Sequence, residues 1–208
     1  MVLCLLLLLL SSCIGVNMDI VLNANGRGTI ALEYRINKSL SALGELDGNE
    51  KWETIPVGMA DFERTLERLP DMKLLSFSSK EEAAITVISA RMEFGNMDSL
   101  FAFLDASGQR SSFSGDARSG RMVLTLSEGS ERKNKDFNEF LAGICEGHAV
   151  RVSFSFPAEG KLTISDRQGR ALEIKGSDIK PRGKSVYFTL PIYEVLTSTN
   201  GINAEFQW

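Results

Sequence analysis

The stretch MDIVLNANGRGTIALEYRI, residues 18–36, decides the fold class that this sequence predicts. It holds two apolar runs, residues 18–23 and 29–36, on either side of Asn25-Gly26, which is the strongest short signal for a β-hairpin. Every other residue of the second run is apolar, namely Ile30, Leu32, Tyr34 and Ile36. Such alternation is typical of a strand in a sheet with one covered face.

Working outward from the hairpin, we expect six further strands, because β-branched and aromatic residues gather in short runs between turn residues. These runs are residues 85–94, 121–127, 149–156, 161–165, 185–190 and 202–208. Apolar residues at helical spacing predict helices over residues 59–69, 96–106, 136–146 and 191–196, with Asn96 as an N-cap. The sequence therefore predicts an α+β fold: one domain, residues 18–208, whose antiparallel or mixed sheet carries several short helices mainly on one face.

The beginning of the chain has the features of an export signal. Residues 2–10 are almost wholly apolar, and Ser11-Ser12-Cys13 follows. The run is too short to span a bilayer, which needs about 20 apolar residues, but it has the length of a signal-peptide core. Leu10-Ser11-Ser12-Cys13 resembles the lipobox of bacterial lipoproteins, in which the cysteine is acylated and becomes the new N-terminus.

That resemblance implies a signal peptide ending at lipidated Cys13 (residues 1–13), a short tether (residues 14–17) and an envelope domain anchored to a bacterial membrane by palmitate-type acyl chains. The protein would then lie on the periplasmic or surface face of that membrane. Two features depart from the pattern: residues 1–9 contain no Lys or Arg, and serine precedes the cysteine. The alternative is an accidental apolar run from a misplaced start, with Met18 as the true first residue.

Net charge and cysteine content limit the classes of partner and of covalent cross-link that the sequence allows. The formal net charge of −4 makes nucleic acid an unsuitable general partner, because phosphate binding needs a basic excess. If the leader leaves with Cys4 and the lipid occupies Cys13, Cys145 is the last of the three cysteines and has no disulfide partner.

The charge is unevenly spread along the chain. Residues 151–190 hold eight basic and four acidic side chains. One reading is an ordinary solvated surface, and the other is a basic face that meets anionic lipid headgroups. The candidate ligand-binding residues of that face are Lys161, Arg167, Arg170, Lys175, Lys180, Arg182 and Lys184.

A family resemblance rests on both ends of the chain. The hairpin of residues 22–32, the run VRVSFSFP (150–157), the run GKSVYFTL (183–190) and the ending AEFQW (204–208) are similar to the LppM-like domain of bacterial lipoproteins. The resemblance implies an envelope-anchored α/β domain that binds lipid or glycolipid and is not an enzyme. It brings no catalytic residues with it.

Catalytic, metal and cofactor chemistry find little support in the residues themselves. His148 is the single histidine, so a His-based metal site is not expected, and no cofactor motif is present. Cys145 and His148 could form a nucleophile–base pair, but Cys145 falls on the apolar stripe of its expected helix, where a core role is favoured. We therefore expect a non-enzymatic protein.

Two hypotheses for its function remain open. The first is a lipid- or glycolipid-binding lipoprotein, which predicts that the many phenylalanines leave an apolar cavity near residues 161–184. The second is a module that docks another envelope protein, which predicts a filled aromatic core and an exposed apolar patch. Phe103 lies off its helical stripe and is expected to be exposed unless another element covers it.

Overall fold

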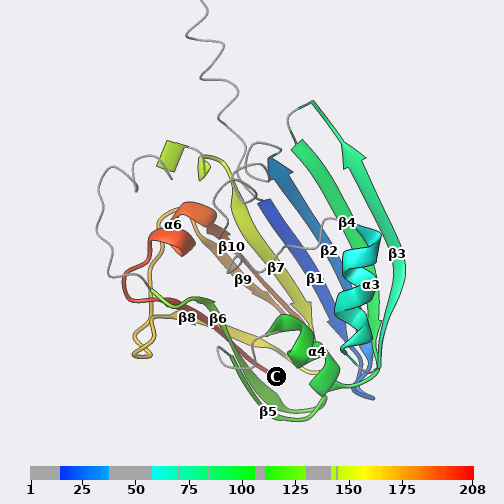
Figure 1. Cartoon of the computed structure of the whole chain (residues 1–208). Helices are drawn as coiled ribbons and strands as arrows, with labels where there is room; N and C mark the ends of the chain where they lie inside the picture. The colour runs from blue at the N-terminus through cyan, green and yellow to red at the C-terminus, as the bar shows by residue number, and fades with distance from the viewer. Residues whose placement is uncertain are drawn as a thin grey trace, which may run out of the picture.

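The chain folds into two β-sheets that share one core (Figure 1). A computed structural model describes residues 15–37, 58–69, 71–83, 85–105, 111–129, 142–143 and 145–208. The expected leader with Cys13, and most of the expected helix over residues 136–146, lie outside these described residues.

The larger sheet has seven strands in the order β3-β4-β2-β1-β7-β10-β9. Their bounds are β3 (Met72–Glu81), β4 (Ile85–Phe94), β2 (Gly28–Asn37), β1 (Gly15–Leu22), β7 (Ala149–Ser155), β10 (Ser185–Pro191) and β9 (Asp178–Arg182). Neighbouring strands are antiparallel except β1 and β7, which run parallel. The predicted hairpin is confirmed, since β1 pairs with β2 from Gly15↔Arg35 to Leu22↔Gly28.

The smaller sheet has four antiparallel strands in the order β5-β6-β11-β8. Their bounds are β5 (Ser112–Gly115), β6 (Gly120–Ser127), β11 (Ile202–Gln207) and β8 (Lys161–Ser165). Three helices are found in the described part of the chain: α3 (Met59–Glu67), α4 (Met97–Leu104) and α6 (Ile192–Thr197).

The prediction of an α+β fold with helices packed mainly on one face is wrong, because the described chain is mostly β and forms two sheets. All eight expected strands are present, but β3, β5 and β9 were not expected. The physical reason for the error is that the smaller sheet, not a layer of helices, covers much of the inner face of the larger one.

Aromatic rings fill the space between the two sheets. The Phe154 ring of β7 lies 4.1 Å from Phe156 and 5.5 Å from Phe206 of β11, measured between ring centroids. Trp208 stacks on Phe156 with its ring centroid 4.8 Å away. These rings pack as a core, and Phe103, whose exposure was in question, is half-buried against the same core.

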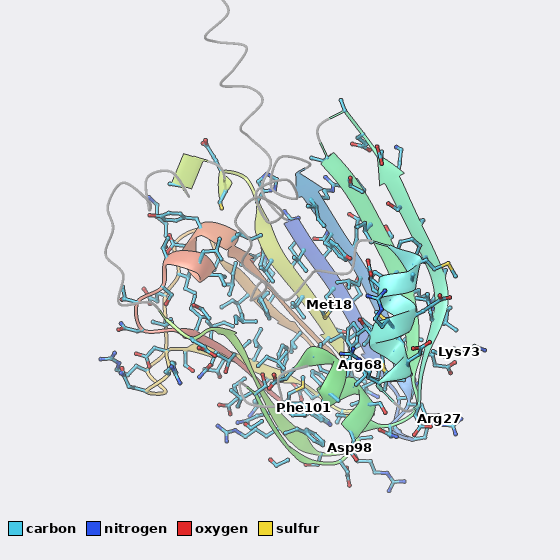
Figure 2. The ribbon with its side chains drawn as sticks, in the orientation of Figure 1. Met18, Arg27, Arg68, Lys73, Asp98 and Phe101 are labelled. Atoms are coloured by element: carbon cyan, nitrogen blue, oxygen red, sulfur yellow. The ribbon has the colours of Figure 1, made fainter. Side chains whose placement is uncertain are left out.

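Two helices extend this core beyond the smaller sheet. Phe62 of α3 is buried and its ring lies 6.5 Å from Tyr34 of β2 and 5.5 Å from Phe77 of β3. Phe101 projects from α4 toward β5, where its ring lies 6.3 Å from Phe113 (Figure 2). The expected N-cap of α4 is confirmed, because the Asn96 side chain accepts a hydrogen bond from the Ser99 backbone N–H at 2.8 Å.

Gly28, the first residue of β2, leaves no room for a side chain. A Cβ atom there would lie 1.9 Å from the Val21 carbonyl oxygen and 2.4 Å from Cζ of Phe94. We therefore expect Gly28→Ala to lower the free energy of unfolding by about 1–3 kcal/mol through strain, measured by urea denaturation of the full chain. Gly15→Ala is the matched control: Gly15 is the first residue of the neighbouring strand, and a Cβ there would make an ordinary 3.7 Å contact with His148. Equal losses for the two variants would contradict this account.

Candidate ligand-binding groove

The outer face of the seven-stranded sheet, opposite the core, carries an open groove of about 1110 Å³. Strand alternation explains its lining: in β1, Ile20 and Leu22 are buried in the core, while Asn17 and Asp19 face outward. The same alternation holds in β2, β4, β7 and β10. The outward positions of six strands thus come together on one surface.

The strand register orders these outward residues into two rows that run across the strands from β3 to β10. The first row is Ser78, Ser89, Glu33, Asn17, Arg151 and Thr189. The second row is Ser76, Arg91, Ala31, Asp19, Ser153 and Tyr187.

The groove is hollow because most of its outward side chains are short. Alanine and five serines form much of its floor, namely Ala31, Ser76, Ser78, Ser89, Ser153 and Ser185. Longer side chains rise between them, above all those of Arg91, Arg151, Glu33 and Tyr187. A floor of hydroxyl groups with charged side chains above it offers many hydrogen-bond donors and acceptors to a ligand.

The two rows differ in how many of their polar side chains already have a hydrogen-bond or ion-pair partner within the protein. In the first row the Asn17 amide donates to Glu33 at 3.4 Å, and the Arg151 guanidinium donates to the Asn17 side-chain oxygen at 3.4 Å. Glu33 also meets Arg35 at 3.6 Å. In the second row, the side chains of Asp19 and Arg91 are exposed and make no hydrogen bond or ion pair with any described residue.

A polar cluster closes the β9 side of the groove. The Tyr187 hydroxyl donates to Asp178 at 2.6 Å, and the Lys180 ammonium meets the same carboxylate at 2.6 Å. The hydrogen bond to Asp178 raises the pKa of Lys180, and its contact with Tyr187 adds to that effect. The Lys180 nitrogen also lies 5.6 Å from the centre of the Tyr187 ring, which holds that ring in place.

The seven basic residues expected to form one ligand-binding face lie on both sheets and in the turns between strands. Lys161 and Lys184 lie at one end of β8, where the Gly160 backbone N–H donates to the Gly183 carbonyl oxygen at 3.2 Å. Arg167 and Arg170 follow the other end of β8, and the Arg170 guanidinium is paired with buried Asp166 at 2.6 Å.

The remaining three belong to the region around β9. Lys175 precedes this strand, and Lys180 and Arg182 lie within it. None of the seven lines the groove. A ligand-binding role for them stays a prediction, and Lys180 borders the groove through its contacts with Asp178 and Tyr187.

A second, smaller hollow of about 410 Å³ adjoins the groove and shares Arg151 and Thr189 with it. It is lined in part by Cys145 and His148. Cys145 is buried and packs beside Ile192 in a small apolar cluster, as expected for a core residue. An acyl-chain cavity was expected beside residues 161–184; of that segment, Gly176 lines the smaller hollow. Lipid binding there stays a prediction.

Two features are absent from the described ranges of the chain. No group of three or more His, Cys, Asp or Glu side chains there could hold a metal ion. The helices there are all too short or too polar to cross a bilayer.

Comparison with known proteins adds one weak likeness. No protein-family model matches the chain, and no curated protein matches it significantly. Among solved structures, the chain is similar to the NMR structure of the folded domain of LppM from Mycobacterium tuberculosis. The TM-score is 0.42 and the sequence identity 11%, over 95% of this chain and 91% of that one. A likeness with a TM-score of 0.42 gives no evidence on the function of this chain.

Proposed function

We propose that the protein is a non-enzymatic lipoprotein of the bacterial envelope, anchored through Cys13, that binds the sugar part of a glycolipid or of another envelope glycan. The observation that carries the proposal is the open groove on the outer face of the seven-stranded sheet, whose outward-pointing side chains are mostly polar. The lipobox-like sequence before Cys13 supports the anchor.

The position of the anchor relative to the groove supports this assignment. Gly15, the first residue of β1, lies two residues after Cys13. The strand β1 is the middle strand of the larger sheet. Two residues of chain reach at most about 7 Å. Lipid on Cys13 would therefore hold this end of the sheet close to the membrane, and with it the first groove residue of β1, Asn17.

The chemistry of the groove suits sugars. Each sugar hydroxyl both donates and accepts hydrogen bonds, and it is recognised best where donors and acceptors lie side by side. Asp19 offers only acceptors and Arg91 only donors, and Ala31 lies between them in the same row. Because these two side chains have no described partner, they can bind a ligand without first breaking an internal bond.

A second candidate function is the docking of another envelope protein. The specific observation in its favour is β3, a ten-residue strand at the edge of the sheet with no neighbour on its outer side among the described strands. Such an edge can pair with an extended segment of another protein.

The test of the proposed function is binding of the full-length chain, purified in detergent, to an array of oligosaccharides, followed by calorimetry on the sugars that bind. Arg91→Ala and Asp19→Ala are each expected to weaken binding roughly 10- to 100-fold, because a hydrogen bond to a charged group contributes about 1.5–3 kcal/mol. Arg118→Ala is the matched control, since Arg118 is an exposed arginine outside the groove.

Absence of sugar binding would overturn the proposal and favour the docking function. Equal weakening by Arg118→Ala would show that binding occurs at another place.

A further inference from the structure

We infer that the groove takes an extended, uncharged oligosaccharide that crosses the strands, and not a single compact headgroup. This inference rests on the proposed function and specifies its ligand. It follows from the length of the groove, from the arrangement of its charges and from its distance to the anchor.

The length of the groove exceeds that of one sugar ring. The two rows cross six neighbouring strands, from β3 to β10. Neighbouring strands lie 4.7–4.9 Å apart, so the five intervals span about 24 Å. The volume of about 1110 Å³ is also slightly above the upper end of the range that holds a drug-sized molecule. A chain of several sugar units would fill this space, whereas one headgroup would occupy a fraction of it.

The charges in the groove balance. Two carboxylates, Asp19 and Glu33, face two guanidinium groups, Arg91 and Arg151. Their order across the sheet is positive on β4, negative on β2 and β1, and positive on β7. A phosphate would be attracted by the two guanidinium groups and repelled by the two carboxylates, and an ammonium group the reverse. The net attraction of either group to the groove would therefore be small. Neutral hydroxyl groups can instead use both kinds of side chain.

The distance to the anchor places this ligand near the membrane. Asp19 is six residues from Cys13, which limits their separation to about 22 Å. Two kinds of molecule would lie this close to the membrane: glycolipids with a long glycan, and polysaccharides next to the membrane. Both would present a neutral sugar chain to the groove.

The inference is tested on the full-length chain in detergent with neutral homo-oligosaccharides of glucose, mannose, galactose and N-acetylglucosamine, each one to eight units long. For the sugar that binds, we expect affinity to rise at least tenfold from two units to six and then to level off. An affinity that is already maximal with one or two units would overturn the inference while leaving the proposed function intact. Tighter binding of a sulfated chain of equal length would overturn the uncharged part of it. If no sugar of any length binds, the proposed function itself fails.

A variant at one end of the groove provides a second measurement. Ser76→Ala combined with Ser78→Ala removes both hydroxyl groups that β3 contributes to the groove. We expect it to weaken binding of the six-unit chain several-fold and to leave binding of the two-unit chain unchanged. Ser79→Ala is the control on the same strand, because alternation points Ser79 to the other face. Equal effects on long and short chains would contradict a ligand that reaches β3.

The same assay with membranes distinguishes the two sources of the sugar chain. Competition by vesicles that carry the six-unit chain on a lipid, but not by vesicles of plain phospholipid, supports a glycolipid. Competition by the free polysaccharide at equal sugar concentration supports an envelope polysaccharide. Competition by plain phospholipid vesicles would overturn the inference.

Discussion

Replacing Phe154 with alanine is expected to lower the free energy of unfolding by about 3–5 kcal/mol, because a large buried ring is lost and a cavity is left in its place. Phe154 of the larger sheet has no exposed surface, and its ring packs against those of Phe156, Phe206 and Trp208. Native domains are stable by only about 5–15 kcal/mol, so this loss is a large share of the total. The measurement is urea denaturation of the full chain, followed by circular dichroism and by tryptophan fluorescence.

Two further variants make this result specific to the space between the sheets. Phe113→Ala also removes a phenyl ring, but Phe113 lies half-buried on the four-residue edge strand β5, so a clearly smaller loss is expected. Phe154→Leu keeps most of the buried volume and is expected to fall between Phe154→Ala and the unaltered protein. If Phe113→Ala destabilised the chain as much as Phe154→Ala, the description of a core centred between the two sheets would be wrong.

The strands could be predicted from the sequence, whereas their assignment to two sheets could not. Alternation identifies β10 and β11 equally well, yet β10 joins the larger sheet and β11 the smaller one. Likewise β1 and β7 pair in parallel although more than one hundred residues separate them. Nothing local to either strand specifies such a partner, because pairing is decided by which apolar faces bury each other.

The strand β3 was missed for a different reason. Most of its residues are exposed, it lies at the edge of the sheet, and its register shifts between Leu74 and Ser76. A bulge shifts the side chains that follow by one position and so interrupts the alternation by which strands are recognised. The run of serines in its second half also lacks the β-branched residues that favour strands.

Only some of the groove residues could be recognised from the sequence. The charged residue Glu33 alternates with the apolar positions of its strand, which indicated a second, solvent-facing side of the sheet. Asn17 was assigned to a tether between lipid and domain, whereas the structure places it in β1. The groove arises only when six strands lie in register, and sequence spacing carries no information on that register. Counting charges along residues 151–190 instead favoured basic residues that the fold distributes over two sheets.

Replacing Cys13 with serine is expected to abolish acylation and to make the protein extractable from membranes by alkaline carbonate. Each buried CH₂ group of an acyl chain contributes about 0.8 kcal/mol, and two or more chains give durable attachment. Serine lacks the thiol that accepts the lipid, so the variant would keep only its uncleaved apolar run. That run has nine residues at most, well short of the 20 or so that span a bilayer. The measurements are incorporation of a labelled palmitate analogue, the intact mass of the mature chain and carbonate extraction.

Cys4→Ser is the matched control, because Cys4 lies within the segment that cleavage before Cys13 would remove. It is expected to leave labelling, mature mass and membrane attachment unchanged. An unaltered protein that carries no label and begins at Met1 or Met18 would remove the anchor from the proposed function. The groove and its sugar-binding variants would still stand, because their argument depends on strand register and side-chain chemistry. In the proposed function, the lipid would determine where the groove works, and the two rows of side chains across β3 to β10 would determine what it can bind.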